Sequence, residues 1–311
     1  MTRLLITGAS GLLGANLVTT AEPTFDVIAV IHTQHIAFSK AQTARVDLTD
    51  ANSVHTLFED YRPDWVIHCA ADTAIDDLEA NPDRATNLNT EMAREVARTA
   101  AATQSRLIFV STDSVFDGRE GPYQESDKPA PLNVYARSKL EGECAVADEH
   151  PGALIVRTNL FGWSPGSKQS LAEWFYSNLA AGESCSGFTD IYFSPVYAPE
   201  LASIFFKMLE NTPAGLYHIP GDECLSKYEF GRRVAQTFGF DPELIKTTQS
   251  DQIDWKAVRP KRTCLNGSKV IQALDISLPS LGEGLARFQR DHKNGLPDHF
   301  QIVPNLEELD A

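Results

Sequence analysis

The feature that most constrains this chain is a glycine-rich segment, TGASGLLG at residues 7–14. It follows a short apolar run at residues 4–6 that is typical of a buried strand, and residues 12–20 continue as a helix. Three glycines recur at every third position: Gly8, Gly11 and Gly14. Because glycine has no Cβ, backbone amides at such a helix start can approach a phosphate closely. A structural tight turn is the alternative, since the spacing differs from G-x-G-x-x-G, but the place of the segment at the first strand–helix junction favours phosphate binding.

Four further apolar runs are short, rich in β-branched residues and separated by helical stretches; they cover residues 25–31, 65–69, 107–110 and 154–156. Their hydrophobicity is continuous rather than alternating, which predicts strands covered on both faces. Strands of this kind, alternating with helices, predict an α/β fold with a doubly wound parallel sheet of the Rossmann type.

The local composition of the sequence changes near residue 160, where aromatic, proline and glycine residues become more frequent. We therefore expect an NAD(P)-binding domain over residues 1–160 and a smaller substrate-binding lobe over residues 161–311, interleaved with the first domain. The stretch from about residue 291 is polar and predicts a loosely attached tail.

Composition excludes several classes of partner. The chain has 42 acidic and 27 basic residues, for a formal net charge of −15, which argues against nucleic acid or an anionic membrane as a partner. No apolar run approaches the roughly 20 residues that span a bilayer, and the early strand leaves no room for a signal peptide. The five cysteines are scattered without a CxxC pair, which predicts neither a disulfide framework nor a zinc site and favours the reducing cytoplasm.

The residues after the second predicted strand bear on the choice of cofactor. A carboxylate there would bind the adenosine ribose of NAD and repel a 2′-phosphate, but the strand ends at Ile31 and His32 follows. We therefore expect NADP(H) in preference to NAD(H), with His32 or Lys40 as the phosphate partner. A metal role for His32 and His35 is disfavoured against a solvated loop, so no metal site is expected. Asp47 and Leu48 follow the next short strand, where a carboxylate can meet the adenine amino group.

Tyr135 and Lys139 stand four residues apart in a segment of good helix formers, so their side chains share one helix face. A phenol has a pKa of about 10, and a neighbouring ammonium favours the phenolate, so such a pair can act as an acid and base. Thr112 or Ser111, at the end of an earlier strand, can hydrogen-bond the same substrate oxygen. A tyrosine and a lysine at this spacing also occur by chance on exposed helices.

Taken together, these segments resemble the extended short-chain dehydrogenases/reductases, and within them the dTDP-4-dehydrorhamnose reductase family. The resemblance runs from residue 3 to about residue 270, in the family's order and approximate spacing. The segments that carry it are TGASGLLGANL, PDWVIHCAADTAIDDLEANPDRATNLNTE, STDSVFDG, PLNVYARSKLEGE, RTNLFG and RPKRTCLN.

The resemblance implies a role for individual residues. The glycine turn would hold the cofactor phosphates, together with its neighbours Ser10, Leu12 and Leu13, and the cofactor trough would be lined by Cys69, Ala70 and Ala71. The catalytic triad would be Thr112, Tyr135 and Lys139, with Asn89 behind it. Tyr135 would donate a proton to a keto oxygen, while Lys139 would bind the nicotinamide ribose and lower the tyrosine pKa. The substrate would contact Ser111, Asp113, Ser114, Val115 and Asn159, although Asp113 can equally serve as a brace for its loop.

The family pattern is incomplete on the substrate side. Ser114 replaces a tyrosine of the family's STDYVFDG, and residues 190–196 lack the glutamine and threonine of DQxGxPT. The expected function is NADP(H)-dependent reduction of a 4-keto sugar nucleotide. Two alternatives remain: a non-catalytic NADP-binding regulatory subunit of the methionine adenosyltransferase type, and another sugar-nucleotide reductase or epimerase. A dehydratase is disfavoured because no glutamate follows Asp113.

The resemblance also implies a homodimer through the helices near residues 87–102 and 134–149. The first of these carries an apolar stripe at four-residue spacing, formed by Leu88, Met92, Val96 and Ala100. The stripe can pack on the sheet or form part of a dimer face, and packing on the sheet is favoured.

Overall fold

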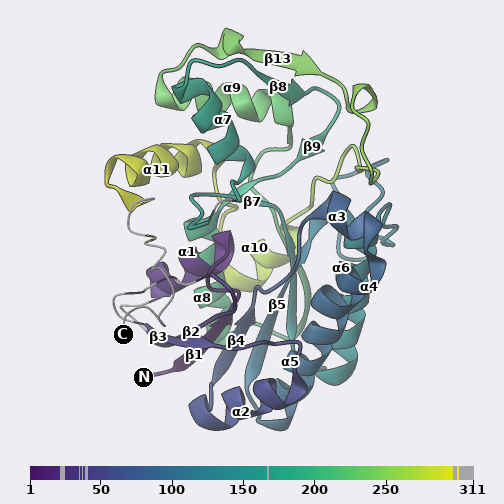
Figure 1. Cartoon of the computed structure of the whole chain (residues 1–311), viewed down its shortest axis with the longest axis vertical. Coiled ribbons are helices and arrows are strands. Elements are labelled where there is room, and N and C mark those ends of the chain that lie inside the picture. Colours follow the sequence, from purple (N-terminus) through teal and green to yellow (C-terminus); the bar gives the residue numbers. More distant parts are fainter. Residues whose placement is uncertain are drawn as a thin grey trace.

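A single sheet of seven strands forms the centre of the first lobe in a computed structural model, which describes residues 1–21, 25–34, 36, 38, 41–166, 168–296 and 300 (Figure 1). All strands are parallel, in the order β11–β6–β5–β4–β1–β2–β3. Their bounds are β1 (Arg3–Thr7), β2 (Asp26–Ile31), β3 (Gln42–Arg45), β4 (Trp65–His68), β5 (Arg106–Thr112), β6 (Leu154–Thr158) and β11 (Gly215–Ile219). The predicted doubly wound parallel sheet is confirmed.

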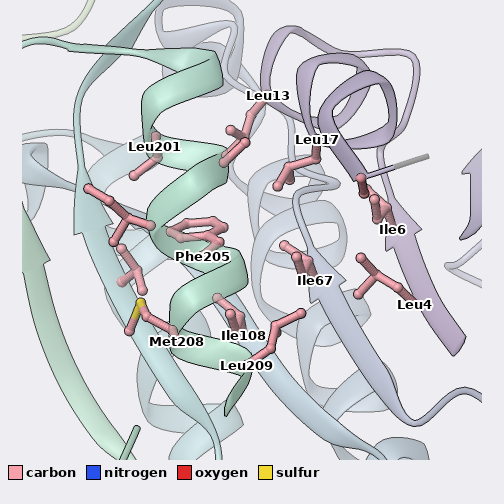
Figure 2. Packing of buried hydrophobic residues seen from close by; sticks show 14 of the residues in the cluster. Leu4, Ile6, Leu13, Leu17, Ile67, Ile108, Leu201, Phe205, Met208 and Leu209 are labelled. Atoms are coloured by element: carbon pink, nitrogen blue, oxygen red, sulfur yellow. The ribbon is translucent and has the colours of Figure 1, made fainter. Parts of the chain in front are cut away.

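Helices cover both faces of this sheet, which is why its strands are apolar on both sides. Leu4 and Ile6 point to one face and Leu5 to the other, as the two-residue period of a strand requires. One face is covered by α1 (Leu12–Ala21), α8 (Ala198–Asn211) and α10 (Ser268–Leu274), and the other by α2 (Ala51–Tyr61), α5 (Met92–Ala102) and α6 (Val134–Glu149). Figure 2 shows Leu201, Phe205, Met208 and Leu209 of α8 in the first of these layers.

The helix predicted over residues 87–102 is divided in the structure. Residues 86–91 form a π-helical turn, η1 (Thr86–Glu91), and α5 follows it directly. Met92, Val96 and Ala100 are buried against the sheet, so the stripe packs on the sheet, whereas Leu88 is only half-buried. The π-helical turn lies against α6, where a Cβ on Gly142 would come within 2.5 Å of the Asn89 carbonyl oxygen.

The second lobe, at the top of Figure 1, combines short strands with three helices around an aromatic core. Trp163 stacks on Phe288 with ring centroids 4.1 Å apart, and Phe161, Phe175 and Phe230 lie in the same cluster. The helices are α7 (Leu171–Ala180), α9 (Lys227–Phe238) and α11 (Leu281–Lys293). The strands pair as β7 (Leu160–Phe161) with β10 (Val196–Tyr197), β8 (Cys185–Phe188) with β13 (Ile245–Thr248), and β9 (Tyr192–Phe193) with β12 (Leu225–Ser226).

The remaining elements are short. They are α3 (Ile75–Ala80), α4 (Pro82–Ala85), η2 (Asp113–Val115), η3 (Pro242–Leu244) and η4 (Ser250–Gln252). The two parts alternate along the chain, because α8 and β11 return to the sheet between β10 and β12 of the lobe. In the part of the chain that the structure describes, no helix is long and apolar enough to cross a membrane.

Two sequence-based expectations change here. Cys224 and Cys264 form a disulfide across a sequence separation of 40, whereas the scattered cysteines predicted no disulfide. The fold brings the two segments together, and spacing along the chain carries no signal of that. The predicted tail begins inside α11, which ends at Lys293, and most of the residues after it lie outside the described ranges.

Candidate functional site

The glycine turn joins β1 to α1 at the carboxyl edge of the sheet. Gly8 has a left-handed φ of +65°, and a Cβ there would come within 2.7 Å of the Ala70 backbone nitrogen. A Cβ on Gly14 would lie 2.2 Å from the Gly8 carbonyl oxygen, so the helix can start this close to the turn only with glycine. Gly11 is exposed and its amide donates to Gly8 O at 2.9 Å. The first amides of α1 have no acceptor within the helix, so their N–H groups can donate hydrogen bonds to a ligand at the turn.

Thr7 connects this turn to the end of β4, a role that the sequence analysis missed. Its hydroxyl accepts from the amides of Cys69 and Ala70 at 3.2 Å each and lies 2.8 Å from His68 Nδ1. Because the Thr7 hydroxyl already accepts two hydrogen bonds, it donates its own proton to the imidazole. His68 therefore accepts at Nδ1 and carries its own proton on Nε2. Burial lowers the pKa of His68 to about 3, which keeps the ring neutral.

The predicted adenosine-binding residues lie at the ends of β2 and β3. The His32 ring is 4.0 Å from the Asp47 carboxylate, and both side chains are about half exposed. Asp47 also accepts from the amide and hydroxyl of Thr49, which lowers the pKa of its carboxyl. The Leu48 side chain is buried in the core, so only its backbone can face a ligand. Lys40 and His35 lie outside the described residues.

The arrangement fits a dinucleotide. Gly8 and Gly14 leave no space for a Cβ, and the half-buried residues Cys69, Ala70 and Ala71 line the adjacent edge. Ser10 and Leu12 are half-buried in the turn, whereas the Leu13 side chain points into the core and can offer only its amide. Small side chains and unpaired amides at a helix start are what a bound pyrophosphate requires.

Tyr135 and Lys139 lie in the first two turns of α6, whose start is held from both sides. The Asn133 side chain caps the helix by accepting from the Ala136 amide at 2.8 Å and donates to Val258 O at 2.8 Å. Tyr135 is 8% exposed and Lys139 is 3% exposed. The Lys139 ammonium donates to Val110 O at 2.8 Å and lies 4.3 Å from the centre of the Phe109 ring. The helix therefore brings both side chains to the end of β5, next to Thr112.

The electrostatics of this pair differ from the sequence-based expectation. Burial raises the pKa of Tyr135 to about 12, with the Thr112 hydroxyl acting in the opposite direction. The expected lowering by Lys139 does not offset burial here, and the lysine ammonium is bound to the Val110 carbonyl. Burial lowers the pKa of Lys139 to about 8, while Glu143 acts to raise it. Tyr135 is consequently a protonated phenol at neutral pH.

Asp113 is the centre of the hydrogen bonds around Thr112. Its Oδ1 accepts from the Thr112 and Ser114 hydroxyls at 3.2 Å each, and its Oδ2 accepts from Thr263 at 2.7 Å and Asn159 at 3.0 Å. The carboxyl is buried, which raises its pKa against the effect of these bonds. Asp113 therefore braces its loop, and Ser114 and Asn159 stay half-buried beside it.

Two residues expected at the substrate face the interior instead. Ser111 donates to Glu143 at 2.5 Å, and that carboxylate pairs with Arg157 at 2.6 Å in a buried ion pair. Val115 is fully buried in a small apolar cluster with Phe116, so it is a core residue rather than a substrate contact. The two-residue period of β5 explains why Ser111 and Thr112 point to opposite faces of the strand. Val115 lies in the 3-10 turn η2, where that period does not apply.

Asn89 lies behind the triad, in the π-helical turn. Its side chain accepts from the Asp72 amide at 2.8 Å and donates to Asp72 O and to Ser138 Oγ at 3.0 Å each. It thus ties the loop after β4 to the middle of the Tyr135–Lys139 turn. A π-helical turn next to a functional site is a recurrent arrangement.

Lys227, the first residue of α9, is a site residue that the sequence analysis missed. Its amide donates to Ile191 O at 2.9 Å, which holds it at the inner side of the lobe. Burial lowers the pKa of its ammonium, and Asp113 acts to raise it while Arg259 acts to lower it. The side chain is half-buried, and the charges of Asp113 and Arg259 both act on it. Its position at a helix start gives no signal in the sequence.

Comparisons with known proteins match almost the whole length of the chain. A family model described as the RmlD substrate binding domain matches residues 1–293. A "probable low-salt glycan biosynthesis reductase" of Haloferax volcanii is 36% identical over 91% of this chain and 96% of its own length. The methionine adenosyltransferase 2 subunit beta of Mus musculus is 32% identical over 86% of this chain and 81% of its own length.

The fold agrees with these sequence matches. The crystal structure of dTDP-4-dehydrorhamnose reductase from Bacillus anthracis in complex with NADP superimposes with a TM-score of 0.84, covering 94% of this chain and 100% of that one at 28% identity. The family match, the parallel sheet and the glycine turn agree along almost the whole length. This chain therefore belongs to the RmlD family of extended short-chain dehydrogenases/reductases.

Proposed function

We propose that this protein reduces a 4-keto sugar nucleotide with NADP(H), as a reductase similar to dTDP-4-dehydrorhamnose reductase. The observation that carries the proposal is that Thr112, Tyr135 and Lys139 meet at the carboxyl edge of a sheet whose glycine turn fits a dinucleotide. Family relatives named as reductases, and a structural relative in complex with NADP, support it.

Tyr135 is the proton donor in this proposal. A bound nicotinamide dinucleotide supplies the hydride. Tyr135 holds its proton at neutral pH because burial raises its pKa to about 12, and it can release that proton to an oxygen on which negative charge develops. Thr112 interacts with the Tyr135 hydroxyl and can hydrogen-bond the same oxygen. Positioned donors of this kind stabilise a developing oxyanion.

Lys139 and Asn89 keep the donor in place. Lys139 is anchored by Val110 O, and its charge lies one helical turn from Tyr135, on the cofactor side next to Cys69. It would hold a ribose hydroxyl of the dinucleotide and counter the charge that Tyr135 acquires. Asn89 fixes Ser138, the residue between them in the helix, so that the catalytic turn moves little.

NADP(H) is preferred over NAD(H) in this proposal because β2 ends without a carboxylate and His32 occupies that end. The substrate would face Ser114 and Asn159 from the sheet and Lys227 from the lobe. A cation in this position suits the diphosphate of a sugar nucleotide. We also propose that the enzyme works in the cytoplasm as a homodimer, with residues 1–160 as the cofactor domain and residues 161–311 as the substrate lobe.

A second candidate is a regulatory subunit that binds NADP without turnover. The similarity to methionine adenosyltransferase 2 subunit beta favours it, as does the departure from the family pattern at Ser114 and Ile191. Ile191 is buried, so the position where the family has glutamine offers no polar group to a sugar. The retained Tyr135, Thr112 and Lys139 favour the reductase over this candidate.

The test is NADPH oxidation with a panel of dTDP-, UDP- and GDP-linked 4-keto sugars. We expect turnover with at least one of them and a loss of about 100-fold or more in Tyr135→Phe, with NADPH affinity retained. Tyr228→Phe, which removes a half-buried hydroxyl that accepts from Arg232 within α9, is the matched control. Tight NADPH binding without turnover, combined with co-purification of a synthetase, would favour the regulatory subunit instead.

A further inference from the structure

The Cys224–Cys264 disulfide joins two segments that lie on either side of β9. Cys224 comes just before β12, whose Ser226 pairs antiparallel with Tyr192. Cys264 follows Arg262, which forms a parallel bridge with the same Tyr192. The disulfide therefore closes a small ladder of three segments, with β9 in the middle.

Both joined segments carry groups of the candidate substrate site. Thr263, next to Cys264, donates to the Asp113 carboxylate at 2.7 Å. Ser226 caps α9, and Lys227 follows it, within electrostatic reach of Asp113. The disulfide thus fixes the spacing between the lobe residues that surround Asp113.

The two sulfurs differ in access. Cys224 is half-buried, whereas Cys264 is fully buried. Cys264 is also held by its backbone, because its carbonyl accepts from the Tyr123 amide at 2.8 Å. A reagent from solvent can therefore reach the Cys224 sulfur more readily than the Cys264 sulfur.

We propose that the Cys224–Cys264 pair is a thiol–disulfide modification site that sets the geometry of the substrate side of the cleft and leaves the cofactor side unchanged. The reactant is a low-molecular-weight thiol. Its thiolate attacks Cys224 Sγ, the S–S bond breaks, and Cys264 leaves as a thiolate that takes up a proton. A second thiol then attacks the mixed disulfide and releases Cys224 as a thiol. The protein disulfide gains two electrons, and two small thiols are oxidised to one small disulfide.

The separation of the two ends of the site supports this selectivity. The disulfide segments contact β9, Tyr123 and Asp113. The glycine turn is held by different residues, Thr7 and the backbone at Ala70. Loss of the disulfide therefore loosens the surroundings of Asp113 without a direct route to the phosphate-binding amides.

The first experiment needs no substrate. Hydrogen–deuterium exchange of the full chain is compared before and after native treatment with a small thiol, with alkylation and mass spectrometry to report the state of each cysteine. We expect Cys224 to be modified before Cys264, faster exchange over residues 190–196 and 262–266, and unchanged exchange over residues 7–14. Equal exchange in the two forms, or faster exchange throughout the chain, would overturn the inference.

The second experiment rests on the proposed function and separates the two claims. With an accepted keto sugar nucleotide, we expect reduction of the disulfide to raise KM by about tenfold while the Kd for NADPH stays within about twofold. Cys224→Ser should show the reduced behaviour with and without thiol, and Cys144→Ser, at an exposed free cysteine, should behave as wild type. Turnover with the same KM in both forms would reject the inference and keep the reductase. A local exchange difference with no turnover on any sugar would keep the inference and reject the reductase.

Discussion

Thr263 donates a hydrogen bond of 2.7 Å to Asp113, which stands 150 residues earlier in the chain. Asp113 in turn accepts from Thr112, so a residue of the second lobe is connected through one carboxylate to the predicted triad. This contact links the lobe directly to the loop at the end of β5. Its removal should therefore affect catalysis more than cofactor binding.

Replacement of Thr263 by valine removes this bond and keeps the shape of the side chain. A lost hydrogen bond to a buried charged group costs about 1–3 kcal/mol of unfolding free energy. We expect that loss in urea denaturation, a decrease in kcat of about tenfold and an unchanged Kd for NADPH. The control is Thr248→Val, at the end of β13, which removes an exposed hydrogen bond from Thr248 to Gln252. An unchanged kcat would show that the bond from Thr263 is not needed to position Asp113 and Thr112.

The charges of Asp113 and Arg259 act on Lys227, and we propose that its ammonium binds the substrate diphosphate. Lys227→Met retains most of the side-chain length without the charge. We expect a rise in KM of about tenfold, from the loss of one charge-assisted hydrogen bond, with kcat little changed. Lys246→Met, at an exposed position on β13, should leave KM as it is. Steady-state kinetics with varied sugar nucleotide measures both, and a change confined to kcat would contradict the assignment.

The alkaline limit of activity should report Lys139. Burial lowers its pKa to about 8, so the ammonium is lost as the pH rises through that value. We expect kcat/KM to fall above about pH 8. Arginine has a pKa above about 12 and stays charged in this range. In Lys139→Arg, kcat/KM should therefore not fall above about pH 8, whatever the absolute rate of the variant. The same alkaline fall in the arginine variant would assign it to another group.

His68 should make the fold sensitive to acid. Its pKa is about 3 in the folded state, against an ordinary value of about 6.5, so only the unfolded chain takes up the proton between these values. Stability contributed in this way is present above about pH 6.5 and is lost as the pH falls. From about pH 7 to about pH 5 the loss is about 2 kcal/mol. His68→Asn can still bind Thr7 but has no titrating ring. Its unfolding free energy should therefore fall by about 2 kcal/mol less than that of the wild type between about pH 7 and about pH 5, as measured by urea denaturation at each pH. An unchanged pH dependence would contradict a neutral buried His68.

Gly14 should not tolerate even one methyl group. The Cβ of alanine would lie 2.2 Å from the Gly8 carbonyl oxygen, so either α1 or the turn must shift. We expect Gly14→Ala to lose about 1–3 kcal/mol of stability and most of its affinity for NADPH, measured by calorimetry. The control is Gly282→Ala in α11, where the nearest atom to the new Cβ is Ser280 Oγ at 3.8 Å. Equal NADPH affinity in Gly14→Ala and wild type would remove the turn from the cofactor site.

The fold was predictable where hydrophobicity and local chemistry agree. The apolar runs correspond to β1, β2, β4, β5 and β6, and the glycine turn appears where a strand meets a helix. The last strand, β11, was not predicted, because GLYHI is a short run between polar and proline-rich segments and resembles the rest of the lobe. Its place in the sheet depends on pairing with β6, which is information about the whole chain.

The candidate site was predictable only as far as local motifs extend. The spacing of Tyr135 and Lys139 indicated a shared helix face. The residues themselves left Thr112 and Ser111 as alternatives, and the family resemblance selected Thr112. Spacing could not show that Tyr135 has a raised pKa, because burial is a property of the folded chain. Thr263 and Lys227 reach Asp113 from distant segments, so no local pattern marks them.

The position of β11 also determines how much of the chain is needed to make the catalytic half. A fragment that stops at residue 160 would keep Tyr135 and Lys139, but β6 would become an uncovered edge strand, and the face beneath α8 would be exposed to water. During synthesis, the sheet therefore lacks its final strand until residues 161–214 have been added to the chain. Attempts to excise a minimal nicotinamide module from this protein should be planned around residues 198–219, which belong to it despite their late place in the sequence.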